Sequence, residues 1–201
     1  PLRRGCMPVI WDLCSGLGGW SEAFVQKGWT VIRIETNADL QHVPHTLQLD
    51  VREWREWAQE LPVPDVIVAS PPCREFSNGY LSPRAMANRA GVDFRPEMDV
   101  VLACKEVIDH FTPAWWVIEN VAGAITFFKP LLGDFRQKVG PFFLWGNIPY
   151  LHMDGFKHSK MEGDVHSSNP MRANLRALIP FELSFELLQT LTNQSRLEEW
   201  I

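Results

Sequence analysis

The sequence predicts an α/β fold in which a mostly parallel sheet carries helices on both faces. Short apolar runs typical of buried strands alternate along the chain with segments of helical periodicity, which is the pattern of repeated βαβ units. The 201 residues are 46% hydrophobic, which is enough for one well-filled core, and no linker-like stretch divides them. We therefore expect a single domain over residues 7–201.

The first predicted strand, turn and helix are the most clearly marked elements. Residues 8–13 (PVIWDL) form an apolar run, CSGLGG follows as a tight turn, and residues 20–28 (WSEAFVQKG) have an amphipathic pattern that Gly28 closes. Residues 30–35 (TVIRIE) then form a second strand that ends in an acid. The order of these elements is strand, glycine turn, helix, strand.

The remaining segments continue this alternation. In chain order, the further predictions are a helix at 51–61, a strand at 66–69, a helix at 97–111, a strand at 114–120 and strand material within 141–151. Residues 179–191 form a closing helix that we expect to lie back against the first strand–turn–helix unit. Two polar segments, residues 74–96 and 151–174, are predicted to be loops.

Charge and cysteine content exclude several classes of protein. The balance of 19 basic against 24 acidic residues gives a net charge of −5, so any nucleic-acid contact must come from local patches. The four cysteines are widely spaced without a C-x-x-C pair, so we expect neither a metal site nor a set of disulfides. This cysteine content fits a protein located in a reducing cytoplasm. No apolar run approaches the length of a membrane span. We also expect the protein to be a monomer.

Four candidate site residues lie at or just beyond the ends of predicted strands. They are Asp12, Glu35, Cys73 and Glu119. In mostly parallel sheets, ligands bind at the carboxyl ends of the strands. This shared edge is the main reason to assign the four residues to one site.

The glycine turn is suited to a ligand that approaches the backbone. Gly16, Gly18 and Gly19 allow positive φ and close contact, although their spacing is not the G-x-G-x-x-G dinucleotide fingerprint. By itself the cluster fits an ordinary tight turn equally well. Glu35 favours the interpretation that the turn binds a ligand, because an acid at the end of the second strand is where the ribose of a nucleotide is usually held.

Cys73 follows two prolines at the end of a predicted buried strand. Pro71 and Pro72 cannot donate to a sheet ladder, so the strand must end there and the thiol is held on a stiff, extended segment. A lone cysteine is most often a small buried hydrophobe, and Cys14 and Cys104 fit that interpretation. The position of Cys73 instead favours a role in the reaction that the protein catalyses.

Three motifs together resemble those of a known family. D-L-C-S-G-L-G-G, S-P-P-C-x-x-F-S and E-N-V, in this order over residues 8–122, resemble the motif set of the DNA cytosine-5 methyltransferases. The resemblance implies a Rossmann-like S-adenosylmethionine-dependent methyltransferase fold, of the kind found in restriction–modification. It implies that Glu35 binds the ribose of the cofactor and Asp50 its adenine. The full set of implied cofactor-binding residues is Asp12, Ser15, Gly16, Leu17, Gly18, Gly19, Glu35, Thr36, Asp50, Val51, Ser70 and Pro71.

The same resemblance implies covalent chemistry on cytosine. C5 of cytosine is a poor nucleophile, and a thiolate that adds at C6 makes C5 reactive toward a sulfonium methyl group. Cys73 would be that nucleophile, and Glu119 would contact N3 and the exocyclic amine. The target base must be flipped out of the duplex or already unpaired.

Candidate contacts to DNA lie mainly in the predicted catalytic loop, residues 74–96. Four arginines against two acids make this loop locally basic, which favours phosphate contact over a merely solvated loop. Arg136 is a candidate for phosphate or for the base oxygen. The full set is Arg74, Ser77, Arg84, Arg89, Asn120 and Arg136.

The sequence departs from the family after E-N-V. The usual Q-x-R-x-R element and a full target-recognition domain are not evident, and residues 151–174 stand in place of that domain. Residues 176–188 occupy the position of the family's last motif, without its usual Gly-Asn. Such a compact form fits a minimal methyltransferase of a prokaryotic or viral context, which could take its specificity from a partner.

Two other functions stay open. A protein of this fold could bind the cofactor and DNA without turnover, or only with a partner. Alternatively, the same chemistry could act on RNA or on another pyrimidine. DNA is favoured because the further motif of the RNA-directed branch is not found.

Overall fold

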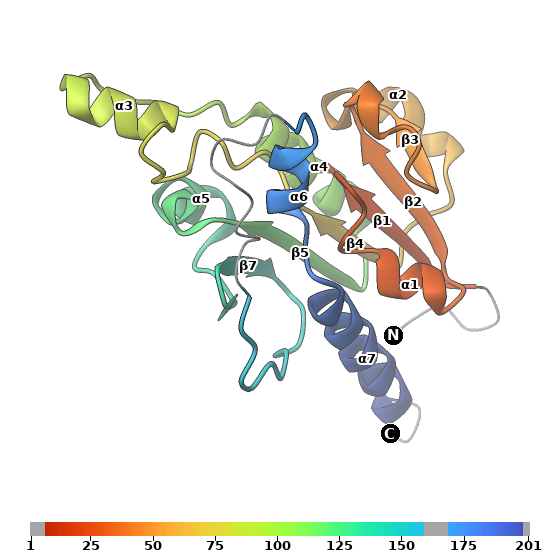
Figure 1. Cartoon of the computed structure of the whole chain (residues 1–201). Coiled ribbons are helices and arrows are strands. Elements are labelled where there is room, and N and C mark those ends of the chain that lie inside the picture. Colours follow the sequence, from red (N-terminus) through yellow and green to blue (C-terminus); the bar gives the residue numbers. More distant parts are fainter. Residues whose placement is uncertain (1–6, 159–168, 199–201) are drawn as a thin grey trace.

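The computed structural model describes residues 7–158 and 169–198, and its centre is a seven-stranded sheet (Figure 1). The strand order is β3-β2-β1-β4-β5-β7-β6. The strands are β1 (Val9–Leu13), β2 (Thr30–Glu35), β3 (Thr46–Gln48), β4 (Val66–Ala69), β5 (Trp115–Asn120), β6 (Gln137–Val139) and β7 (Phe142–Gly146). β3, β2, β1, β4 and β5 pair in parallel, while β7 is antiparallel to β5 and β6, so the prediction of a mostly parallel sheet is confirmed.

Helices cover both faces of this sheet. The α-helices are α1 (Glu22–Gln26), α2 (Trp54–Trp57), α3 (Pro83–Ala90), α4 (Asp99–Phe111), α5 (Ile125–Leu132), α6 (Arg172–Ala177) and α7 (Phe181–Glu198). Short 3₁₀ turns are η1 (Ala38–Leu40), η2 (Val51–Glu53), η3 (Ala58–Glu60) and η4 (Ala122–Ala124). In the described part of the chain, no helix is long and apolar enough to cross a membrane.

The strands supply two cores because successive side chains point to opposite faces. In β4, Ile67 and Ala69 join the core formed with α2, α4 and α5, whereas Val66 and Val68 join the core formed with α1 and α7. All four side chains are fully buried, which is expected for a strand covered on both sides. β4 therefore reads as a continuous apolar run.

The closing helix lies where the sequence predicts it. α7 runs beside α1 in Figure 1. Ser184 Oγ in α7 donates to Trp20 O at 2.6 Å and accepts from Ala23 N at 3.2 Å. These two hydrogen bonds join the C-terminal helix to the segment that follows the glycine turn.

The prediction that residues 74–96 form a loop is wrong for α3. Ser82 caps this helix, since its Oγ accepts from Ala85 N at 3.2 Å, and Pro83 occupies the first helical turn. Gly91 ends it with a φ of 67°. No residue of α3 is buried, and Met86 is the one large apolar side chain in its sequence PRAMANRA, so the apolar stripe of a core-facing helix is missing.

The predicted variable segment 151–174 is described only in part. Residues 151–158 have no regular structure, and α6 begins at Arg172. Residues 159–168 and Cys6 lie outside the described residues. The short strand β6 was not predicted, because three residues at the edge of a sheet carry too little pattern.

Candidate active site

Polar side chains gather on one face at the carboxyl ends of the central strands. Alternation from the buried residues of each strand places Asp12, Arg33, Glu35, Ser70 and Glu119 on the face that α1 and α7 cover. β1, β2, β4 and β5 are neighbours in the sheet. The structure thus brings Asp12, Glu35 and Glu119 to one sheet edge, as the sequence predicts.

Glu35 holds the glycine turn through the backbone. Its Oε2 accepts from Gly16 N at 2.8 Å, and its Oε1 accepts from Asn37 N at 2.9 Å. Within the turn, Gly18 N donates to Ser15 O at 2.8 Å. A carboxylate has about four acceptor positions, so Glu35 keeps capacity for hydroxyl donors after these two bonds.

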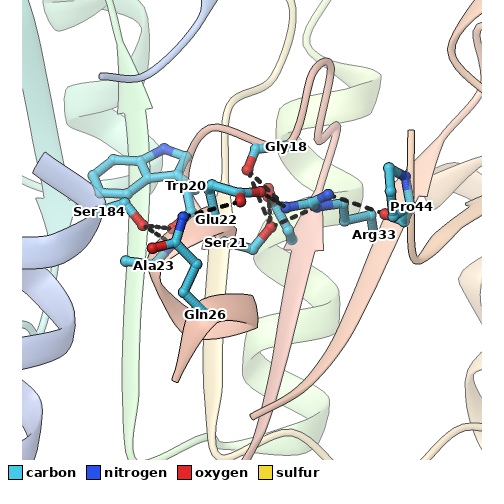
Figure 2. A network of polar contacts seen from close by, with 10 residues as sticks. Gly18, Trp20, Ser21, Glu22, Ala23, Gln26, Arg33, Pro44 and Ser184 are labelled. Atoms are coloured by element: carbon cyan, nitrogen blue, oxygen red, sulfur yellow. Dashed lines mark hydrogen bonds and ion pairs between the residues drawn. The ribbon is translucent and has the colours of Figure 1, made fainter. Parts of the chain in front are cut away.

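Arg33 supports the turn from beneath (Figure 2). This arginine is only 1% exposed, and its guanidinium donates to Ser21 Oγ at 2.8 Å and to Gly18 O at 3.1 Å. It also pairs with Glu22 at 3.1 Å and donates to Pro44 O at 3.0 Å. A Cβ at residue 18 would lie 2.8 Å from Arg33 Nη1, so this network requires glycine there.

Asp12 belongs to the same buried network. Ser21 Oγ donates to Asp12 Oδ2 at 2.6 Å, while Asp12 Oδ1 has no hydrogen-bond partner among the described residues. Burial raises the pKa of Asp12 to about 7, against the opposing effects of the Ser21 hydrogen bond and the charge of Arg33. Asp12 thus lies beneath the turn, and Gly18 is the part of the turn that contacts this buried network.

A small cavity lies on the outer side of the turn. Its volume is about 60 Å³, and it is enclosed between the glycine turn and the segment at residues 174–179. The predicted residues that line it are Ser15, Gly16, Leu17, Gly19 and Ser70, and the residues that were not predicted are Cys14, Trp20, Asn174, Ala177, Leu178 and Ile179. Ser15 Oγ is buried without a hydrogen-bond partner in the described part of the chain.

The other predicted cofactor residues lie outside the cavity lining. Thr36 is exposed after β2, and Val51 is buried in the core on the opposite face. Asp50 follows β3, and its carboxylate accepts a bidentate pair from Arg52, with a shortest distance of 2.6 Å. This hydrogen-bonded pair lowers the pKa of Asp50. Pro71 is buried beside the nucleophile turn.

The turn that carries Cys73 is latched to the next strand. Asn120 is fully buried, and its Nδ2 donates to Pro71 O at 2.9 Å. The carbonyl of Cys73 accepts from Phe76 N at 3.1 Å and from Ser77 N at 3.0 Å, which closes the turn. Cys73 itself is half-buried. Asn120, predicted as a base contact, therefore acts here on the backbone that positions the thiol.

Glu119 is connected to the strand that precedes Cys73. Ala69 and Ile118 are register partners in β4 and β5, so the next residues, Ser70 and Glu119, lie side by side. Ser70 Oγ donates to Glu119 Oε2 at 3.1 Å and accepts from Trp20 Nε1 at 3.0 Å. The role of Trp20 was missed, and its one sequence signal is its position directly after Gly-Gly.

The predicted DNA contacts in the catalytic loop differ in how they are held. Arg74 is exposed, and Ser77 Oγ accepts from the backbone of the same loop. Arg84 donates to Gly123 O at 2.8 Å and lies 5.2 Å from the ring centroid of Phe127. Arg89 is exposed and lies over the Tyr80 ring, at 3.9 Å from its centroid.

Arg136 lies outside this loop, but its backbone is aligned with Glu119 across the sheet. Its backbone N–H donates to Leu144 O at 2.7 Å, and Leu144 is the register partner of Glu119. Two strand spacings, about 10 Å, therefore separate the backbones of Arg136 and Glu119. The Arg136 side chain is exposed.

Comparison with known families identifies this constellation. The family model for C-5 cytosine-specific DNA methylases matches residues 9–135. The chain belongs to this family. The match contains the glycine turn, the Cys73 turn and Glu119, so the resemblance inferred from the three motifs is confirmed. A comparison with curated proteins gave no significant match.

Solved structures of methyltransferases resemble this family member. A presumed DNA modification methyltransferase encoded within an E. coli prophage is 20% identical, with a TM-score of 0.44, over 69% of this chain and 46% of that chain. Dnmt2 from Spodoptera frugiperda, in a mutant form, is 22% identical, with a TM-score of 0.38, over 58% and 36%. Dnmt2 methyltransferase from S. pombe is 20% identical, with a TM-score of 0.37, over 58% and 35%. The chain thus spans less than half the length of these proteins.

The predicted Rossmann-like methyltransferase fold is also confirmed, and the family uses S-adenosylmethionine. The chemistry at the glycine turn fits this cofactor. The orphaned Ser15 hydroxyl and the remaining acceptor capacity of Glu35 are available to a ligand, and a Cβ at Gly16 would meet nothing within 4 Å. The residues present therefore suit a polar ligand that lies against the backbone.

The cavity beside the glycine turn is small compared with known ligand sites. Small-molecule sites usually measure at least about 300 Å³, whereas 60 Å³ holds about two waters. Leu178 and Ile179 close the cavity, since a Cβ at Gly19 would lie 2.9 Å from Leu178 Cδ1 and 2.8 Å from Ile179 N. In the present arrangement the segment at residues 174–179 therefore leaves little room for a ligand at the turn.

Proposed function

We propose that this protein transfers a methyl group from S-adenosylmethionine to C5 of cytosine in DNA. The observation that carries the proposal is the pairing of the Cys73 turn with Glu119 at neighbouring strand ends. A hydrogen bond from Asn120 to Pro71 O joins the Cys73 turn to the end of β5. A hydrogen bond from Ser70, just after β4, reaches Glu119. Both residues lie within the segment that matches the cytosine C-5 methylase family.

The chemistry is proposed as addition followed by elimination. The Cys73 thiolate forms a bond to C6 of cytosine, while Glu119 supports N3 and the exocyclic amine as charge develops in the ring. The cofactor supplies an electrophilic methyl group. C5 then bonds to this methyl group as the methyl–sulfur bond of the sulfonium breaks and leaves a thioether. Loss of the C5 proton to a water or another base, with cleavage of the Cys73–C6 bond, restores the aromatic ring and the thiolate.

Cofactor binding is proposed at the glycine turn. Ser15, Gly16, Leu17, Gly19 and Ser70 would contact the ligand directly, because they line the cavity. Glu35 would hold the ribose with the acceptor positions that Gly16 and Asn37 leave over. Asp12 and Gly18 would act through the buried Arg33 network beneath the turn.

Contact with DNA is proposed at the α3 arm, which we define as residues 78–95. It follows the nucleophile and projects away from the sheet in Figure 1. Its apolar side chains face solvent to an unusual degree: Tyr80 is 74% exposed, Leu81 78%, Met86 47% and Val92 60%. Aromatic and arginine side chains together stack on bases and neutralise phosphates. Arg74, Arg84 and Arg89 are the proposed phosphate contacts.

One experiment tests the reaction directly. The full chain is incubated with methyl-labelled S-adenosylmethionine and mixed-sequence duplex DNA, and the digested nucleosides are identified by mass spectrometry. We expect label in 5-methyldeoxycytidine. Cys73→Ser should abolish transfer and keep cofactor binding, whereas Cys104→Ser, which changes a core cysteine beside Cys14 on the face of the sheet opposite Glu119, should retain transfer. Loss of cofactor binding in Cys73→Ser would make Cys73 structural and contradict the assignment.

A second candidate function is favoured by the small cavity. Because Leu178 and Ile179 close the site, the protein could bind the cofactor and DNA productively only with a specificity partner. In that case the assay with the isolated chain would give no labelled nucleoside, while calorimetry would show weak cofactor binding. RNA in place of DNA in the same assay tests the third possible function, methylation of RNA.

A further inference from the structure

Two hydrogen bonds in series join the glycine turn to the carboxyl group of Glu119. Trp20 Nε1 donates to Ser70 Oγ at 3.0 Å, and Ser70 Oγ donates to Glu119 Oε2 at 3.1 Å. Trp20 is 1% exposed, and both Trp20 and Ser70 line the cavity beside the turn. The series therefore runs from the proposed cofactor site to the proposed base-binding acid.

The direction of this series follows from the chemistry of its members. An indole N–H can only donate, so the Ser70 oxygen must accept from Trp20. A hydroxyl carries one hydrogen, and the hydrogen of Ser70 is then directed at Glu119. Rotation of the hydroxyl away from the carboxyl group would cost the second bond while Trp20 keeps the first.

We propose that Ser70 is a positioning residue for Glu119 and that Trp20 fixes the Ser70 hydroxyl as its donor. This inference rests on the proposed function, in which Glu119 contacts cytosine. Because Oε2 accepts the Ser70 hydrogen, the carboxyl plane is restrained in the orientation in which Glu119 would contact N3 and the exocyclic amine. Ser70 thus acts on the base only through Glu119.

The surrounding sequence offers two matched controls. Ser184 is also a buried serine that contacts Trp20, but its hydroxyl bonds the backbone carbonyl of Trp20 and does not contact Glu119. Trp54 is also a buried tryptophan with a hydrogen-bonded Nε1, but its acceptor is Glu106 on the opposite face of the sheet. Variants of these two residues separate a general packing effect from the proposed one.

The first test follows the relay without any reaction. In isotope-labelled protein, the indole N–H resonance of Trp20 is identified by its loss in Trp20→Phe, and its chemical shift is followed against pH. We expect a titration that is absent in Glu119→Gln and in Ser70→Ala but present in Ser184→Ala. Asp12 and Glu35 lie on the same face, and they are unchanged in Glu119→Gln. A titration in Glu119→Gln that is as large as in the wild type would overturn the proposal.

The second test measures single-turnover methyl transfer at saturating cofactor and DNA. A hydrogen bond to a charged group contributes enough that Ser70→Ala should slow transfer roughly 10- to 100-fold. In a Glu119→Gln background the same change should cost less than about twofold, since its effect passes through Glu119. Ser70→Thr, which keeps the hydroxyl, should recover much of the rate, and Trp20→Phe should lose more than Trp54→Phe.

The two tests separate the possible failures. If wild-type protein transfers no methyl group while the indole titration behaves as expected, the proposed function fails and the relay stands. If Ser70→Ala slows transfer equally with and without Glu119, the relay is wrong and the proposed function stands. An equal loss in Ser70→Ala and Ser184→Ala would likewise reduce Ser70 to a packing residue.

Discussion

The glycine turn and the α3 arm hold their arginines in opposite ways. Under the turn, Arg33 is 1% exposed and donates hydrogen bonds to two side chains and two backbone carbonyls of the described chain. On the arm, Arg89 lies over Tyr80, which is itself 74% exposed, and Arg95 pairs with Asp93 at 3.6 Å at the surface. One region fixes its cation, and the other leaves its cations close to solvent.

This difference has a physical consequence for binding. Interactions of a buried charge are strong because the interior screens them poorly, whereas exposed ion pairs contribute little. The turn is therefore committed to one geometry, which suits recognition of a small cofactor. The exposed Arg89 and Arg95 can exchange their present contacts for phosphates at small cost, which suits a surface that meets DNA.

The largest expected effect comes from removing the buried cation. Arg33→Met removes the guanidinium donor of Ser21 Oγ and Gly18 O and the positive charge near the buried Asp12, which keeps its hydrogen bond from Ser21. Because each hydrogen bond to a charged group contributes about 1.5–3 kcal/mol, this change should cost about 3–5 kcal/mol of unfolding free energy. Denaturant titration measures this loss. Arg52→Met is the matched control, because its bidentate pair with Asp50 is shorter but exposed. A comparable loss in the two variants would contradict the contrast between buried and exposed pairs.

The next effect is a pH dependence of stability from Asp12. Its pKa rises from 3.8 in the unfolded chain to about 7 in the folded protein, so the folded state binds more protons between these values. Stability therefore falls as pH rises from about 4 to 7, by up to about 4 kcal/mol, and levels off above 7. Asp12→Asn, which stays neutral and can still accept from Ser21, should lack this decline.

Urea titrations of wild type and Asp12→Asn across this pH range give the measurement. The difference between the two proteins isolates Asp12 from other groups that titrate. If the two curves stay parallel from pH 4 to 8, Asp12 does not carry the dependence.

The sequence predicts the parts of this molecule that depend on local pattern. β4 is a continuous apolar run because both its faces are covered, and Cys73 is found because two prolines end that strand. The motifs also include five predicted cofactor residues that line the outer side of the turn, namely Ser15, Gly16, Leu17, Gly19 and Ser70. These features can be read from neighbouring residues alone.

The features that the sequence did not predict depend on contacts between distant segments. Asp12 was predicted to bind cofactor, but its burial depends on Ser21 and Arg33, which belong to other elements. Trp20 looks like any core aromatic until Ser70 is placed beside it. The docking of the closing helix was predicted, but the closure of the cavity by Leu178 was not, because no local pattern places this side chain, just before α7, against the glycine turn.

A smaller effect is expected where the arm begins. Arg84 joins it to η4 through one hydrogen bond to Gly123 O and contact with the Phe127 ring. Arg84→Met should lower the unfolding free energy by about 1 kcal/mol, since one hydrogen bond and one cation–π contact are lost near the surface. Arg89→Met, which loses only its contact with Tyr80, should be nearly neutral in the same thermal or urea melt. Equal effects would show that Arg84 is not an anchor.

The smallest effect on stability is expected at the tip of the arm. Tyr80 and Leu81 are the most exposed large apolar side chains of the described chain, so Tyr80→Ser with Leu81→Ser should change the unfolding free energy by less than about 0.5 kcal/mol. If these side chains stack on bases, affinity for duplex DNA should fall about tenfold, because each stacked base contributes about 1–3 kcal/mol. Fluorescence anisotropy measures that affinity.

A matched double change on another exposed apolar pair, Phe181→Ser with Phe185→Ser in α7, controls for surface hydrophobicity. DNA affinity should hold in this variant, because α7 docks against α1 rather than beside the nucleophile turn. Loss of affinity only in the arm variant, with stability intact in both, would place the arm on the DNA. Unchanged affinity in the arm variant would leave its exposed apolar side chains without a nucleic-acid role, and the contrast between turn and arm would then concern stability alone.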